Sequence, residues 1–134
     1  MKKPPLRILI CDDERSILRV AELALQVRGH EVDTAVSAAG AIEHFERRRK
    51  AREIYDLVLL DIEMPLESGF VAGGHMRGRG YSGRMAFMTA HQPELENFAH
   101  LNAEYWNKPF ALGELAALVE NLPLDCPPPK EAVK

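Results

Sequence analysis

Five residues with chemically useful side chains each stand at the end of a short, mainly apolar or aromatic run: Asp12, Asp13, Asp61, Thr89 and Lys108. A carboxylate at the end of a buried strand is paired, bound to a metal or used in chemistry, because an isolated buried charge is too costly. Three carboxylates at one edge would repel one another, and a divalent cation relieves that repulsion. Because the ligands would all be oxygens, Mg²⁺ is the metal that this set of residues suits.

The runs before these residues predict the strands of a parallel sheet. Leu57–Leu60 are four consecutive apolar residues, as in a strand buried on both faces, and Met64-Pro65 then stop the strand. Further strands are expected at 6–11, 31–35, 84–89 and 104–107. Helices are expected at 14–28, 38–51, 66–79, from Pro93 to about 101, and 111–122. The first should have Ile17, Leu18, Ala21 and Leu25 on one face and Gly29 as its C-terminal cap, and Asn102 can end the fourth in a left-handed conformation. Alternating strands and helices with short loops predict a three-layer α/β fold, and ligands bind beyond the carboxyl ends of the strands in such sheets.

The 134 residues predict one domain at 6–122 and a proline-rich extended tail at 123–134. A net charge of −3 gives no global indication of nucleic acid as a direct partner. Basic residues gather at the end of the helix expected at 38–51, where they also complement the helix dipole. No signal peptide is recognisable and no run is long enough for membrane insertion. Two cysteines without a predicted disulfide suit a reducing cytoplasm.

Four motifs in order resemble the receiver domain of response regulators in two-component signalling: Cys11-Asp12-Asp13-Glu14, Asp61-Ile62-Glu63-Met64-Pro65 with Gly69, Thr89-Ala90, and Lys108-Pro109-Phe110. The resemblance implies a doubly wound five-stranded parallel sheet in the flavodoxin-like order 2-1-3-4-5, covered as α/β/α layers. It also implies a signalling module and not an enzyme.

The same resemblance assigns a metal site and a phosphoacceptor. Asp61 would be the nucleophile that accepts a phosphoryl group. Asp13, Asp61 and the backbone carbonyl of Glu63 would bind Mg²⁺, with Asp12 assisting through water. Lys108 would balance the charge of the phosphoryl group from the other side.

Two further residues would act as the switch. Thr89 would donate its hydroxyl to a phosphate oxygen, and Tyr105, three residues before Lys108, would swing inward in response. By resemblance, Glu63 and His91 modulate the phosphate lifetime, although His91 also suits a solvated loop.

The expected phosphoryl donor is a histidine kinase or a histidine phosphotransfer protein, and the downstream partner is an unknown protein. Two alternatives stay open. The chain could be a receiver cut from a larger regulator, whose proline-rich tail is then a linker. It could also be a phosphatase of the haloacid-dehalogenase type, although Asp61-Ile62-Glu63 only approximates the Asp-x-Asp pattern of that class.

Two stretches depart from the family. The helix expected at 66–79 contains four glycines, which predicts a short, frayed or irregular helix. The chain between Thr89 and Lys108 is shorter than usual by about one helical turn. Leu101 and Trp106 would then be left to dock a partner in place of the usual dimer, although Trp106 also suits a core position.

Overall fold

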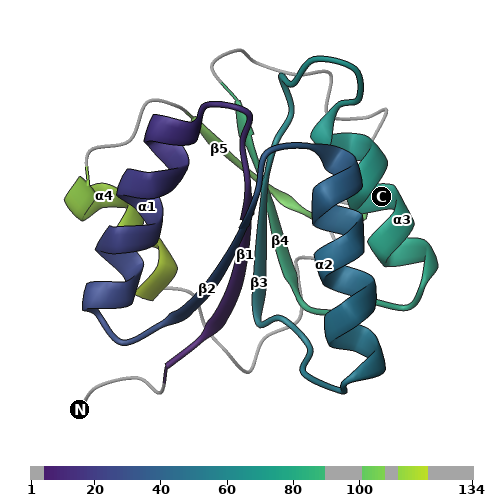
Figure 1. The fold of residues 1–134 in the computed structure, drawn as a ribbon, viewed down its shortest axis with the longest axis horizontal. Coiled ribbons are helices and arrows are strands. Elements are labelled where there is room, and N and C mark those ends of the chain that lie inside the picture. Colours follow the sequence, from purple (N-terminus) through teal and green to yellow (C-terminus); the bar gives the residue numbers. More distant parts are fainter. Residues whose placement is uncertain (1–4, 90–100, 108–111, 121–134) are drawn as a thin grey trace.

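Five parallel strands form one sheet in the order β2-β1-β3-β4-β5 (Figure 1). The computed structural model describes residues 5–89, 101–107 and 112–120. Its strands are β1 (Arg7–Cys11), β2 (Glu31–Ala35), β3 (Leu57–Asp61), β4 (Arg84–Thr89) and β5 (Glu104–Asn107). Its helices are α1 (Arg15–Val27), α2 (Ala38–Lys50), α3 (Gly69–Gly78) and α4 (Leu112–Glu120). The predicted strand order and α/β class are confirmed.

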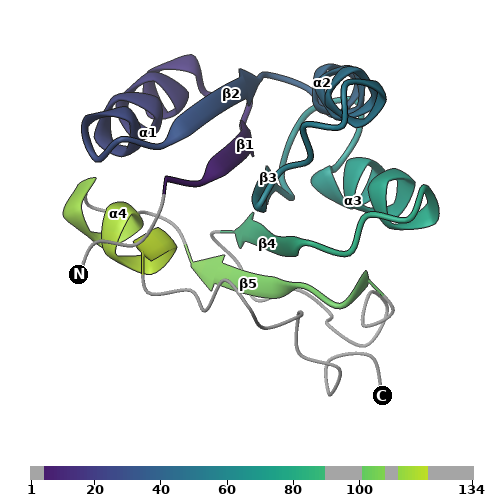
Figure 2. The same ribbon diagram turned by 90° about the horizontal axis from the view of Figure 1, so that it is seen from below.

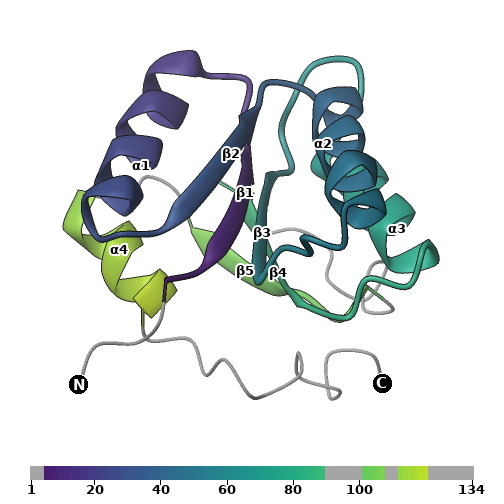
Figure 3. The same ribbon diagram turned by 60° about the horizontal axis from the view of Figure 1, so that its bottom comes forward.

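The helices cover both faces of the sheet. Helices α1 and α4 pack side by side on one face, and α2 and α3 on the other (Figures 2 and 3). Neighbouring residues in a strand point to opposite faces. Leu57 and Leu59 therefore enter the core under α1 and α4, while Val58 and Leu60 enter the core under α2 and α3. All five residues of β3 are buried, which explains its continuous apolar sequence.

Helix α1 confirms most of its predicted core face and corrects one residue. Leu18, Ala21 and Leu25 are buried, but Ile17, which we expected on the same face, is 38% exposed. The helix advances by about 100° per residue, so the face centred on Leu18 and Leu25 leaves Ile17 at its margin. Gly29 follows the helix at φ +94°, as the predicted C-terminal cap requires.

Helix α3 begins later than predicted and is continuous. It starts at Gly69, where Ser68 caps it by accepting a hydrogen bond from the N–H of Phe70 at 2.9 Å. Leu66, expected as its first residue, has φ +72° and is fully exposed, so it cannot belong to a right-handed helix. The helix is not frayed at Gly73, which has a packing role. A Cβ at this position would lie 2.8 Å from Cζ of Phe87, so glycine allows α3 to approach β4 closely.

Two residues expected on a docking surface lie in the core instead. Leu101 is 2% exposed and Trp106 is 7% exposed. Trp106 joins the core under α1 and α4, and Leu101 joins the core under α2 and α3. The docking role predicted for Leu101 is therefore wrong, because its side chain is already packed, and for Trp106 the alternative of a core position is confirmed. The shortened segment between Thr89 and Leu101 lies outside the described residues.

The half-buried Arg77 holds the segment that enters β5. Its guanidinium donates to the carbonyl oxygens of Leu101 at 2.7 Å and Asn102 at 3.0 Å, and also to those of Tyr81 and Gly83. Asn102 adopts the left-handed conformation predicted for it, with φ +55°. These bonds fix β5 to the carboxyl end of α3.

Arg48 in the basic end of α2 binds acidic side chains of this chain. It forms ion pairs with Asp33 and Glu31 of β2, both at 2.8 Å, and with Glu53 at 3.0 Å. Its charge therefore serves the packing of α2 on the edge strand. No helix in the described parts of the chain is long and apolar enough to cross a membrane.

Candidate functional site

The strand register brings the predicted site residues to one edge of the sheet. Cys11 of β1 pairs with Leu60 of β3, so Asp12 and Asp61 leave their strands at the same level. Asp61 in turn pairs with Met88 of β4, and Thr89 follows at the next position. The predicted convergence of these residues at the carboxyl ends of the strands is therefore observed for Asp12, Asp61 and Thr89.

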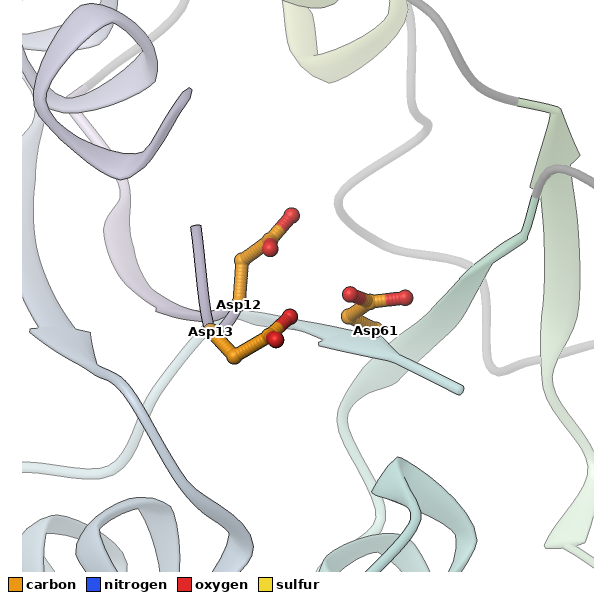
Figure 4. Close-up of side chains that lie close together, drawn as sticks. All are labelled: Asp12, Asp13 and Asp61. Atoms are coloured by element: carbon orange, nitrogen blue, oxygen red, sulfur yellow. The ribbon is translucent and has the colours of Figure 1, made fainter. Parts of the chain in front are cut away.

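Three carboxylates meet at this edge (Figure 4). Asp12, Asp13 and Asp61 each contribute an oxygen, and the three oxygens lie within 4.8 Å of one another. Asp12 is 0% exposed and Asp61 2% exposed, whereas Asp13 lies at the surface of the cluster, half-buried. Such an arrangement of oxygen donors fits a hard divalent cation.

Backbone N–H groups orient two of these carboxylates. Oδ1 of Asp12 accepts a hydrogen bond from the N–H of Glu14 at 3.0 Å, and Oδ1 of Asp61 accepts one from the N–H of Glu63 at 3.1 Å. In both cases the donor lies two residues further along the chain, so the local turn sets the side-chain direction. The side chain of Glu63 is itself exposed.

Gly69 packs against the backbone of Asp61. A Cβ at position 69 would lie 2.3 Å from the carbonyl oxygen of Asp61, a distance that no side chain tolerates. Glycine at this position therefore lets α3 begin directly against the end of β3. The start of α3 and the position of the Asp61 backbone are coupled by this contact.

The field of the acidic cluster acts on Cys11. Burial and, to a smaller extent, the negative charges of Asp12, Asp61 and Asp13 together raise the pKa of the Cys11 thiol to about 12. The thiol donates a hydrogen bond to the carbonyl oxygen of Ser37 at 3.2 Å. Cys11 is thus an inert protonated thiol beneath the site.

The two predicted switch residues are both described. Thr89 is buried at the end of β4, with 2% of its surface exposed. Tyr105 is half-buried on β5, and its hydroxyl oxygen is buried without a hydrogen-bond partner among the described residues. Its ring lies 5.6 Å from that of Phe87, centroid to centroid. The predicted site residue Lys108 lies outside the described residues, as do His91 and Pro109.

Sequence reasoning missed Phe70. This residue of α3 contacts Phe87, with ring centroids 4.6 Å apart, and approaches Tyr105 at 6.5 Å. The glycines nearby predicted an irregular helix, so no register between α3 and β5 could be assigned. The dipeptide Gly69-Phe70 directly before an otherwise small-residue stretch was the one available signal.

A comparison with models of protein families matches residues 8–120 to the response regulator receiver domain. The chain belongs to this family. The alternative of a haloacid-dehalogenase type of phosphatase is thereby set aside, and the recognition made from the four motifs is confirmed.

Several relatives of this receiver domain are named regulators. It is 31% identical over 117 residues to the transcriptional regulatory protein DltR of Streptococcus agalactiae, covering 85% of this chain and 50% of the relative. It is 34% identical over 113 residues to the transcriptional regulatory protein KdpE of Mycobacterium tuberculosis, covering 82% and 47%. The chain thus spans about half the length of these curated relatives.

Solved receiver structures share its fold. The response regulator protein TrrA of Thermotoga maritima, solved in complex with Mg²⁺-BeF, is 33% identical with a TM-score of 0.69, covering 89% of this chain and 96% of that one. A CheY-like receiver domain protein from Methanospirillum hungatei is 25% identical with a TM-score of 0.72, covering 87% and 91%.

Proposed function

We propose that this receiver domain accepts a phosphoryl group on Asp61 from a histidine kinase or a histidine phosphotransfer protein. The observation that carries the proposal is the meeting of Asp12, Asp13 and Asp61 within 4.8 Å at the carboxyl edge of the sheet. Of these three residues, only Asp61 ends the central strand β3, which is buried along its whole length. The N–H of Glu63, in the turn that leads toward α3, orients the Asp61 carboxylate.

The reaction is a transfer between two nucleophiles. A carboxylate oxygen of Asp61 forms a bond to phosphorus while the phosphorus–nitrogen bond of the donor phosphohistidine breaks, and the electron pair of that bond stays on the imidazole. The product is an acyl phosphate on Asp61. Such transfers depend chiefly on positioning and charge neutralisation. The N–H of Glu63 positions the carboxylate, and the buried hydroxyl of Thr89 is proposed to donate to a phosphoryl oxygen.

A magnesium ion would be held by Asp13 and Asp61 directly, together with the backbone carbonyl of Glu63, and by Asp12 through water. When bound, Mg²⁺ supplies positive charge against the phosphoryl oxygens. The fit rests on the donor set, because three converging carboxylates offer hard oxygen ligands only. We propose Lys108 as the second source of positive charge, on the ground of the family motif that it shares.

The phosphorylated domain is proposed to act as a signalling module, not as an enzyme, by switching a surface that binds an unknown protein. We expect this to take place in the cytoplasm and without direct contact with nucleic acid. In relatives such as KdpE the matched region is about half of a transcriptional regulator, so the chain can equally be the receiver part of a longer regulator. Either arrangement uses the same chemistry at Asp61.

Phosphotransfer from purified histidine kinases tests this function. Each kinase is first phosphorylated on its histidine with labelled ATP, and the receiver is then added with Mg²⁺. We expect label to move to the wild-type chain, to be absent from Asp61→Asn, and to be prevented by a chelator of Mg²⁺. Equal labelling of the wild type and Asp61→Asn would contradict the assignment of Asp61.

A further inference from the structure

Three aromatic rings connect the start of α3 with β5. Phe87 lies between them, 4.6 Å from Phe70 and 5.6 Å from Tyr105, and Phe70 itself is 6.5 Å from Tyr105. All three separations fall within the roughly 4.5–7 Å over which tilted aromatic pairs attract one another. Phe87 and Tyr105 are also register partners in the β4–β5 ladder, so this part of the contact is built into the sheet.

The ring of Tyr105, and not its hydroxyl, holds the side chain in place. The hydroxyl oxygen is buried, and the described part of the chain offers it no hydrogen-bond partner. A buried hydroxyl without a partner disfavours the position in which it lies. Burial also raises the pKa of Tyr105, as expected for a phenol shielded from water. The apolar contacts of the ring must therefore outweigh the loss of hydration at the hydroxyl.

Phe70 is placed by the reactive edge itself. Its N–H donates to Oγ of the capping Ser68 at 2.9 Å, and the preceding Gly69 packs directly on the carbonyl of Asp61. Phe87, its neighbour, stands two residues before Thr89 on β4. The contact between Gly69 and the Asp61 carbonyl thus fixes the backbone next to Phe70, and the ring of Phe70 extends from there toward Tyr105.

We propose that Phe70 is a positioning residue that keeps Tyr105 in its inward, half-buried position, with the hydroxyl oxygen buried, before any phosphoryl group is bound. In this chain the side chain of Tyr105 then already points inward in the unphosphorylated protein, and phosphorylation is not required for that position. The role of Tyr105 as a switch residue rests on the proposed function, phosphorylation of Asp61. The inference assigns to α3 a control over the switch residue, beside the expected control through Thr89.

Fluorine NMR of the full chain labelled with 3-fluorotyrosine measures this directly. The chain has three tyrosines, Tyr55, Tyr81 and Tyr105, and Tyr105→Phe identifies the third resonance by its loss. A neutral gadolinium chelate in solution broadens only resonances that water can reach. We expect the Tyr105 resonance of the unphosphorylated wild type to be protected, and Phe70→Ala to abolish that protection.

A matched control separates positioning from general stability. Phe45 is a buried residue of α2 in the core against which Phe70 and Tyr105 pack, and its ring lies 6.3 Å from that of His75 and 5.8 Å from that of Tyr81, centroid to centroid. Phe45→Leu should lower the melting temperature without exposing Tyr105. Phe70→Leu keeps apolar volume at position 70 and serves where Phe70→Ala does not fold, with a smaller loss of protection expected.

Two results would overturn the inference: a Tyr105 resonance already broadened in the unphosphorylated wild type, or one equally protected in the wild type and both Phe70 variants. Addition of beryllofluoride with Mg²⁺ tests the proposed function separately. If no resonance responds to beryllofluoride, phosphoacceptance at Asp61 is in question. The comparison of the wild type with the Phe70 variants without beryllofluoride still decides the role of Phe70.

Discussion

Position 69 has room for glycine alone, because the helix that begins there rests on the carbonyl of Asp61. Gly69→Ala places a methyl group 2.3 Å from that oxygen, so the backbone must move. We expect a loss of roughly 1–3 kcal/mol in the free energy of unfolding, the usual range for overpacking, together with slower phosphorylation. Denaturant unfolding and a phosphorylation time course measure the two effects.

Gly74 in the same helix is the matched control. A Cβ at position 74 meets nothing within 4 Å, so Gly74→Ala should stabilise α3 by about 0.5–1 kcal/mol through its higher helix propensity. Phosphorylation should be unchanged. If Gly69→Ala and Gly74→Ala had the same effect on unfolding, the contact between Gly69 and Asp61 would not be the constraint described.

The hydroxyl of Tyr105 gives a second prediction at this scale. Because it is buried without a partner among the described residues, Tyr105→Phe should stabilise the unphosphorylated protein by about 1 kcal/mol, the lower part of the range for removing such a group. Tyr81 is the control, since its hydroxyl donates to the carbonyls of Tyr55 at 3.0 Å and Arg84 at 3.1 Å. Tyr81→Phe should destabilise by a similar amount. Urea unfolding decides, and a destabilised Tyr105→Phe would contradict the account.

Helices α2 and α3 are joined at the level of elements by Glu46. Its carboxylate lies 2.8 Å from Nε2 of His75 and 3.1 Å from Nε of Arg79, and also pairs with Arg49. The hydrogen bond from His75, followed by that from Arg79, lowers the pKa of Glu46 from 4.5 to about 2. A single carboxylate of α2 thus binds His75 of α3 and Arg79, the residue that caps α3.

The pH dependence of stability follows from this shift. A carboxyl whose pKa is lowered by folding contributes its stabilisation in full above its unfolded pKa of 4.5 and loses it as the pH falls through about 2. The difference in unfolding free energy between the wild type and Glu46→Gln should therefore have its full value above pH 4.5 and shrink between pH 4.5 and 2. Denaturant unfolding of both proteins across this range measures it, and a difference that does not vary with pH would count against the lowered pKa.

The strands could be predicted from the sequence because each depends on local pattern. Leu57–Leu60 can be buried only between two layers, and the order of the sheet came from the resemblance and not from the pattern. The starts and faces of helices were less secure. Leu66 has an apolar side chain that suits a helix, yet Glu67 N–H donates to the carbonyl of Pro65 at 2.8 Å and forces a tight turn at Leu66. Ile17 was assigned to the core face for a different reason. Its apolar side chain suits either the core face of α1 or the margin of that face, and hydrophobicity does not distinguish the two.

The sequence could identify those site residues whose side chains carry the chemistry themselves and stand at the end of a predicted strand. Asp12, Asp13 and Asp61 could be found in this way because parallel strands bring their carboxyl ends together. The contact between Phe70 and Tyr105 could not, because it depends on how α3 packs over β4 and β5. That packing is set by Gly69 and Gly73, whose absent side chains appear in the sequence only as poor helix formers.

Across the whole molecule, His30 connects the two ends of the described chain. Its Nδ1 accepts the N–H of Leu6 at 3.0 Å, and its Nε2 lies 3.3 Å from the carboxylate of Glu120 at the end of α4. Arg28 holds the other oxygen of Glu120 at 2.8 Å. The ring therefore bridges Leu6, just before β1, and Glu120 of the last described helix, which lies 90 positions after His30 in the sequence.

Removal of this ring should loosen both ends together. His30→Ala leaves the buried N–H of Leu6 without its acceptor, so we expect a loss of about 1–3 kcal/mol in unfolding free energy. Hydrogen exchange should accelerate at Leu6 and in α4 and not in α3. His44→Ala, which removes a partly exposed histidine from α2, is the control and should change little. Uniform acceleration throughout the sheet would show that His30 acts through general stability and not as a bridge.

The central claim is that Asp61 takes up one phosphoryl group, and intact-mass measurement tests it most directly. The chain is incubated with acetyl phosphate, with Mg²⁺ or with a chelator, alongside Asp61→Asn and Asp13→Ala. We predict a mass increase of one phosphoryl group in the wild type with Mg²⁺ only, none in Asp61→Asn, and a strongly reduced amount in Asp13→Ala, which removes one of the three clustered carboxylates. An unmodified wild type, or the same increase in Asp61→Asn, would contradict the account.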